Sequence, residues 1–219
     1  MTTTPAPAIA PRLPLITASL ALLWLLARAL YAWAVPQPDN ALALAEALQS
    51  QQLAYTFLAL LAVLLHVCMV VLFLVLARGV LGKYGRGGIT SALCTLLFAL
   101  TSVPAHFSQV IMPLVAAAIS GGEAFGRTDN LARLTLDWPG SGAGLVVGIS
   151  YALLGMPALL IGLKLWRTGN QPSGALLMAG TVLACTALVG TIAGYAAIDE
   201  PVKELAAYDP PILATLKAL

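Results

Sequence analysis

The sequence predicts an all-α integral membrane protein with five transmembrane helices. Hydrophobic residues make up 60% of the 219 residues and charged residues only 9%, whereas soluble domains carry roughly 25% charged residues. Five apolar runs are each long enough to cross the roughly 30 Å hydrocarbon core of a bilayer as a helix. Strands of a membrane barrel would instead appear as short segments of alternating polarity, so the expected fold class is an all-α membrane bundle.

The five predicted spans cover approximately residues 13–35, 53–77, 88–119, 142–166 and 173–198. The longest stretch between them is the loop 120–141, which leaves little sequence for a soluble domain. We therefore expect a single transmembrane domain over residues 1–219.

The first span carries polar side chains on one helical face. Thr17, Trp24, Arg28 and Tyr31 follow one another at intervals of seven, four and three residues, which return to the same side of an α-helix. Arg28 either extends to the outer interface or faces inward toward an acceptor or an anionic ligand. The small-residue segment Ala32-Trp33-Ala34 resembles a signal-peptide cleavage site, but the apolar run exceeds the roughly 7–15 residues of such a peptide, so we expect the span to be retained.

The chain has two histidines, His66 and His106, and they lie near the middle of the second and third spans. A titratable side chain at membrane depth is costly unless it faces protein or a cavity, so both are candidates for a functional site. The basic turn Gly79–Gly87 joins the two spans, which makes them neighbours with the histidines at comparable depth. The imidazoles are expected either to approach each other or to flank a common ligand.

The third span carries a polar stripe. Its members are Ser91, Thr95, Ser102, His106 and Gln109, at intervals of four, seven, four and three residues. These intervals place them on one helical face, and because lipid offers no hydrogen bonds, the stripe should face the bundle interior. Pro104 and Pro113 flank His106 and are expected to bend the helix. The stripe serves either to hold helices together or to line a ligand site.

The fourth and fifth spans are rich in small residues at helical spacing. These are Gly144, Gly148, Gly155 and Gly162 in the fourth span and Gly190 and Gly194 in the fifth. Small residues let helix backbones approach closely in lipid, so we interpret both sets as packing surfaces. Tyr151 and the bend expected at Pro157 are the features of the fourth span that are placed to reach a central site.

Charged residues outside the spans segregate by side. With a cytoplasmic N-terminus, the inward segments hold Arg12, Arg78, Lys83, Arg86, Lys164 and Arg167 and no acid. The outward segments hold all nine acids, which are Asp39, Glu46, Glu123, Asp129, Asp137, Asp199, Glu200, Glu204 and Asp209. Because lysine and arginine in short loops favour the cytoplasmic side, the sequence predicts an N-in, C-out orientation. Segments Asp39–Gln49 and Thr128–Leu136 are expected to form short interfacial helices on the outer face.

This layout of an N-terminal span, an outer helical loop, a basic cytoplasmic hairpin and glycine-rich spans resembles that of small multi-span inner-membrane proteins of bacteria. The resemblance implies the bacterial inner membrane as the location. It involves no shared residue motif and therefore transfers no site residues. The chain also lacks a phosphate-binding G-x-x-x-x-G-K-[ST] loop, an H-E-x-x-H motif and a pair of carboxylates within the spans, which disfavours the common enzyme classes that use them.

The leading interpretation is a non-catalytic or accessory protein of the bacterial inner membrane. We expect Arg28, Tyr31, His106, Gln109 and Tyr151 to form a polar pocket in the outer half of the bundle. The pocket would bind a small or lipid-like ligand or a partner subunit. The expected partners are the lipid bilayer and either another membrane protein or further copies of this chain, with no nucleic acid.

Two alternatives belong to other functional classes. The first is a b-type haem protein for electron transfer, with His66 and His106 as axial ligands to the iron and Arg28 near a propionate. The second is a small permease that works as an oligomer. Haem predicts an intense visible spectrum, a permease predicts solute flux, and an accessory subunit predicts a co-purifying partner.

Overall fold

The computed structural model describes residues 12–34, 50–82, 85–119 and 142–196. Its elements are α1 (Arg12–Ala34), α3 (Gln52–Leu76), η1 (Ala77–Leu81), α4 (Arg86–Ile119), α6 (Gly142–Arg167) and α7 (Gln171–Ala196). Five helices, counting η1 as the continuation of α3, are long and apolar enough to span a membrane. The predicted all-α architecture with five spans is therefore confirmed, and these residues contain no strand.

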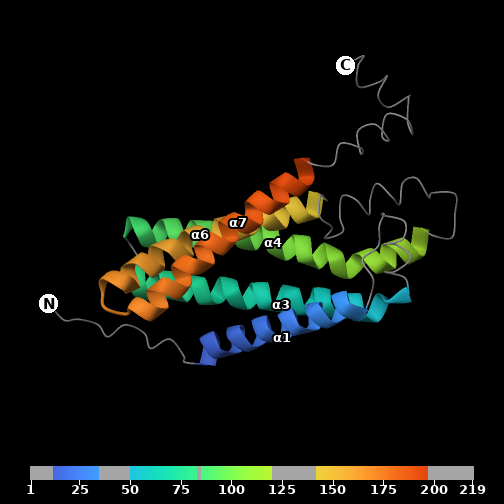
Figure 1. Ribbon diagram of the computed structural model, residues 1–219, viewed down its shortest axis with the longest axis horizontal. Helices are drawn as coiled ribbons and strands as arrows, with labels where there is room; N and C mark the ends of the chain where they lie inside the picture. The colour runs from blue at the N-terminus through green and yellow to red at the C-terminus, as the bar shows by residue number, and fades with distance from the viewer. Residues whose placement is uncertain (1–11, 35–49, 83–84, 120–141, 197–219) are drawn as a thin grey trace, which may run out of the picture.

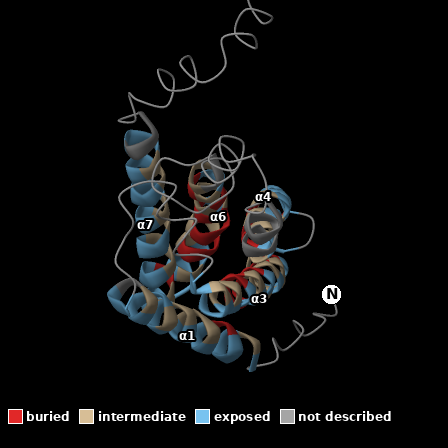
Figure 2. Ribbon diagram, turned by 90° about the vertical axis from the view of Figure 1, so that its right-hand side faces the viewer, coloured by how far each residue is buried: buried red, intermediate tan, exposed pale blue. Residues whose placement is uncertain are grey.

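The helices follow one another around an arc, each packing chiefly against its neighbour in chain order. The centre of the arc is formed by α3, α4 and α6, with α1 lying along α3 and α7 crossing α6 (Figure 1). Figure 2 shows that buried residues gather on the central helices, whereas α1 and α7 are mostly exposed. Long helices with an apolar exposed surface are what a lipid environment requires.

The second span ends in a turn that differs from the predicted one. A turn was expected from Gly79 to Gly87, but helical hydrogen bonding continues through the π-helix η1 to Leu81, and α4 already begins at Arg86. The chain reverses at Gly82, whose φ of +83° favours glycine. Gly88 packs directly against the Gly82 carbonyl, where a Cβ atom would collide. The turn is shorter than predicted because these two glycines allow close backbone approach.

The apolar core lies next to this turn, between the three central helices. Leu154, Ala158 and Ile161 of α6 pack with Phe73, Ala77 and Phe98 from the second and third spans. The contact of η1 with both α4 and α6 extends this core to the end of the second span. The core thereby sets the relative positions of three helices whose polar side chains meet further along the bundle.

Helices α6 and α7 pack closely through glycines, as the sequence predicts. A Cβ atom on Gly148 would lie 2.8 Å from Oγ1 of Thr191, and one on Gly162 would lie 3.0 Å from the carbonyl oxygen of Gly174. The prediction that Gly190 packs in the same way is wrong, because nothing lies within 4 Å of a Cβ atom built there. Gly190 is on the exposed side of α7, which the spacing of glycines alone does not reveal.

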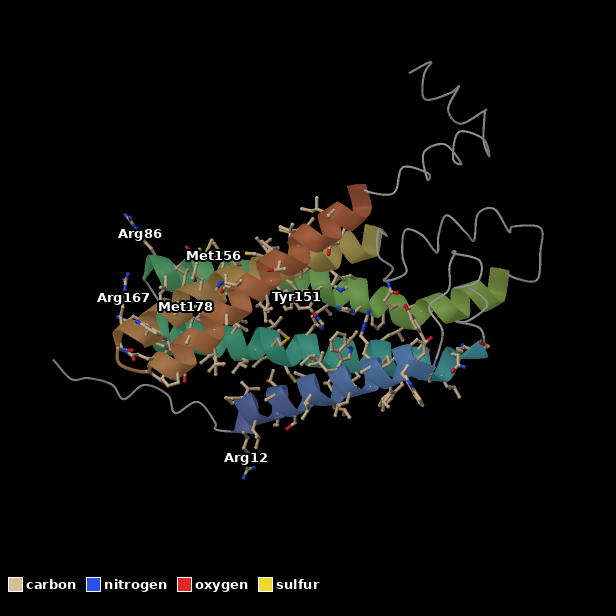
Figure 3. The ribbon with its side chains drawn as sticks, viewed as in Figure 1. Arg12, Arg86, Tyr151, Met156, Arg167 and Met178 are labelled. Carbon is tan, nitrogen blue, oxygen red and sulfur yellow. The ribbon has the colours of Figure 1, made fainter. Side chains whose placement is uncertain are left out.

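Some predicted features lie outside the described residues. These are the interfacial helices Asp39–Gln49 and Thr128–Leu136, the outer loop 120–141 and the tail after residue 196. Of the bases predicted to face inward, Arg86 and Arg167 lie at the end of the molecule that carries the α6–α7 turn, and Arg12 begins α1 in the same half of the bundle (Figure 3).

Candidate functional site

The polar stripe of α4 faces the interior, as predicted. Ser91, Thr95 and Ser102 are fully buried, and His106 and Gln109 are each only 4% exposed. Thr95 and Ser102 donate hydrogen bonds to carbonyl oxygens one turn earlier in α4, at 2.7 Å in both cases. Such bonds to the helix's own backbone satisfy hydroxyls without tying helices together. The part of the stripe that reaches other helices is therefore its C-terminal end, at His106 and Gln109.

His66, His106 and Tyr151 meet at the centre of the bundle, and we call this group the central cluster. His66 is fully buried at the middle of its span, and the centroid of its ring lies 4.2 Å from that of His106, with an interplanar angle of 42°. Nε2 of His66 lies 3.0 Å from the hydroxyl of Tyr151. The cluster thus joins one side chain from each of α3, α4 and α6, and Figure 3 shows Tyr151 close to the middle of the bundle.

The partners of His66 determine the direction of its hydrogen bonds. Nδ1 lies 2.6 Å from the carbonyl oxygen of Ala62, and because a carbonyl only accepts, Nδ1 carries the hydrogen. In the neutral imidazole, which burial in a membrane span favours, Nε2 is then an acceptor. The hydroxyl of Tyr151 therefore donates its hydrogen to Nε2 of His66. Both nitrogens of this ring are engaged within the protein.

An aromatic side chain completes the surroundings of His66. The ring of Phe98 is stacked on that of His66, with 5.5 Å between centroids and 24° between planes, and it also lies 6.1 Å from the ring of Tyr151. Phe98 itself is fully buried. These contacts hold the imidazole in one orientation by packing as well as by hydrogen bonding.

A second polar contact lies near the N-terminal end of α3. The hydroxyl of Tyr55 donates to Oε1 of Gln109 at 2.6 Å, and we call these two residues the tyrosine–glutamine pair. The ring of Tyr31 on α1 lies 6.5 Å from that of Tyr55 at 57°. Since Gln109 is one helical turn from His106 on α4, a band of polar and aromatic groups extends from α1 through the tyrosine–glutamine pair to the central cluster.

Arg28 lies on the exposed surface of α1, one helical turn before Tyr31. It is exposed, and its guanidinium carbon lies 5.5 Å from the centroid of the Trp24 ring on the same helix. A guanidinium over an indole is a favourable cation–π arrangement. Of the two positions that the sequence leaves open for Arg28, the structure shows a surface position on α1.

The five residues of the predicted pocket are therefore distributed over three places. His106 and Tyr151 join His66 in the central cluster, Gln109 and Tyr31 contact Tyr55, and Arg28 lies at the surface of α1.

Sequence reasoning missed Tyr55 and Phe98. Phe98 lies three residues after Thr95 and four before Ser102, so the spacing of the polar stripe already places it on the same face. Phe98 was missed because the stripe was defined by its polar residues alone. Tyr55 carried a weaker signal, as a hydroxyl near the N-terminal end of the second span, and its pairing with Gln109 depends on how α3 and α4 cross.

Bis-histidine haem ligation does not fit the imidazoles as they are arranged. Imidazole nitrogens bind metals at about 2 Å. Two axial histidines would therefore have their ligating nitrogens about 4 Å apart, one on each face of the porphyrin, and their ring centroids further apart still. Here the ring centroids themselves are 4.2 Å apart, which leaves no room for a porphyrin. Both nitrogens of His66 also have partners in the protein. Within the described residues no group of three metal-ligating side chains occurs.

Comparison with known proteins finds no matching family model, no matching curated protein and no matching solved structure. The described residues contain no carboxylate, so imidazoles, phenols and an amide supply the donors and acceptors at membrane depth. Such groups can form hydrogen bonds with a neutral molecule or with another helix.

Proposed function

We propose that this chain is a non-catalytic or accessory protein of the bacterial inner membrane that binds a small or lipid-like ligand along the band from Tyr31 to the central cluster. The N-terminus is cytoplasmic and the C-terminus is outside, which places the tyrosine–glutamine pair in the outer half of the bilayer. Four exposed bases lie at the opposite end and support this orientation: Arg78, Arg86, Lys164 and Arg167.

The observation that carries the proposal is the hydrogen bond between Tyr55 and Gln109, two polar side chains from different helices, continued by the tilted contact of Tyr31 with Tyr55. Helices that only need to pack in lipid use small residues, as α6 and α7 do here. Polar groups at membrane depth are costly and tend to mark functional sites. A ligand with an apolar body and a hydrogen-bonding head group suits such a band between α1 and α4.

The test is native mass spectrometry of the protein extracted from its own membrane in lipid nanodiscs. A retained molecule that is enriched over the bulk lipids supports the proposal, provided that Gln109→Leu loses it and Thr186→Val keeps it. Thr186 is a suitable control because it is exposed on α7 and bonds to its own helix. If wild-type protein carries only bulk lipid in bulk proportions, the proposal is wrong. A stoichiometric co-purifying protein would instead favour an accessory subunit, and solute flux in liposomes would favour a permease.

A further inference from the structure

A group of four exposed bases lies at the end of the molecule that carries the two helical turns. Arg78 belongs to η1, Arg86 begins α4, and Lys164 and Arg167 lie in the last turn of α6. All four are exposed, and we call them the basic surface. Figure 3 shows the Arg86 and Arg167 side chains extending from the same end of the bundle.

Backbone packing brings the two turns together. The turn after α3 is held close by Gly82 and Gly88, and the turn after α6 by the approach of Gly162 to Gly174. The π-helix η1 packs against both α4 and α6, so the bases of the two turns belong to one surface. π-Helical turns are rare and frequently occur at functional sites.

The charge of this surface has no counterpart in the described residues, which contain six bases and no acid. An arginine or lysine at the membrane interface that has no acidic neighbour among the described residues is well placed to bind a phosphate group. Trp166, which is 44% exposed beside Arg167, adds an amphipathic ring of the kind that anchors helices at the head-group level.

We infer that the basic surface binds the phosphate head groups of anionic phospholipids in the adjoining leaflet. Clusters of lysine and arginine at the ends of membrane helices attract anionic lipids by charge, and basic sites between helices hold their head groups. The inference rests on the positions of these four bases and not on the central cluster or on the ligand proposed above. It would stand if that ligand were absent.

Tryptophan quenching by brominated lipids tests the inference. A variant that keeps Trp166 and has phenylalanine at the other three tryptophans is reconstituted into bilayers of equal phosphatidylglycerol and phosphatidylcholine. Bromine is carried by the phosphatidylglycerol in one sample and by the phosphatidylcholine in the other. Both leaflets then have the same composition, so the result does not depend on orientation. We expect stronger quenching of Trp166 by brominated phosphatidylglycerol, and a smaller difference at high salt.

Substitution of all four bases by glutamine should remove this difference. Each neutralised base is expected to lower the local preference for the anionic lipid by up to about fivefold. Arg28→Gln, which removes the exposed base at the other end of the bundle, should leave quenching of Trp166 unchanged. A parallel variant that keeps only Trp33, which is 86% exposed near that other end, should show no effect of the four substitutions.

Quenching of Trp166 in the protein that keeps all four bases tests the inference even if the glutamine variant folds poorly. Equal quenching of Trp166 by the two brominated lipids would overturn the inference. Unequal quenching that persists in a folded variant lacking all four bases would overturn it as well, because the preference would then have another source.

Discussion

The hydroxyl of Tyr151 on α6 lies 3.0 Å from Nε2 of His66 on α3, and it joins two helices that each pack against α4 but little against each other. The hydrogen bond therefore closes a triangle whose other two sides are the α3–α4 and α4–α6 contacts. With Nδ1 of His66 bonded to the Ala62 carbonyl, Tyr151 is the donor, and its loss leaves a buried acceptor.

Tyr151→Phe should lower the free energy of unfolding by about 1 kcal/mol, because the substitution removes one interhelical hydrogen bond and keeps the ring. Equilibrium unfolding in lipid bicelles measures this change. Thr186→Val removes a hydroxyl that bonds within α7 and should have almost no effect. Equal stability of wild-type and Tyr151→Phe protein would show that the hydrogen bond contributes nothing.

The tyrosine–glutamine pair should show energetic coupling in a double-mutant cycle. Tyr55→Phe and Gln109→Leu together should cost less than the sum of the single substitutions, with a coupling energy of about 0.6 kcal/mol and at most about 1.7 kcal/mol, as for other hydrogen bonds within membranes. Tyr55→Phe combined with Tyr151→Phe serves as the control and should be additive within about 0.5 kcal/mol. Additivity of the first pair would argue against a direct bond in the membrane.

Glycine substitutions on α7 should separate the packed face of the helix from the exposed one. A Cβ atom on Gly174 would lie 2.7 Å from the carbonyl oxygen of Gly162 and 2.8 Å from the backbone nitrogen of Trp166, whereas nothing lies within 4 Å of one on Gly180. Gly174→Ala should therefore destabilise the protein by about 1–3 kcal/mol through overpacking against backbone atoms.

Gly180→Ala is the matched control, because it adds the same methyl group to the same helix. It should be neutral, or stabilising by up to about 1 kcal/mol through helix propensity. Thermal unfolding in one detergent, followed by circular dichroism, compares the two variants. A Gly174→Ala protein as stable as Gly180→Ala would mean that α6 and α7 are further apart than described.

Protein purified from haem-replete cells should lack the visible spectrum of a low-spin bis-histidine haem, because the imidazoles are too close to admit a porphyrin. An absorption spectrum of the protein extracted from its native membrane tests this expectation. A strong Soret band that disappears in both His66→Ala and His106→Ala would contradict it and would require the two helices to move apart.

The proposed N-in, C-out orientation predicts the location of two loops. Alkaline phosphatase, which is active only outside the cytoplasm, should be inactive when fused at Lys83 and active when fused at Arg127. Fusions of green fluorescent protein at the same positions should give the opposite pattern. Phosphatase activity at Lys83 and none at Arg127 would reverse the orientation.

The sequence alone determined the fold class, the five spans and the inward orientation of the α4 stripe. Each of these follows from a strong and local constraint. A bilayer requires about 20 apolar residues for each helical span, and lipid penalises an unsatisfied polar group wherever it lies. The spacing from Ser91 to Gln109 therefore predicted a buried face without any knowledge of the neighbouring helices.

Only the tertiary structure decided which side chains meet. The contact of His66 with Tyr151, the pairing of Tyr55 with Gln109 and the surface position of Arg28 depend on how four helices cross and rotate. The η1 turn, the apolar core and the close approach of backbone glycines determine that geometry jointly. A helical period identifies the face that a residue occupies, but it contains no information about the partner that the face meets, so Gly148 and Gly190 look alike in the sequence and differ in the fold.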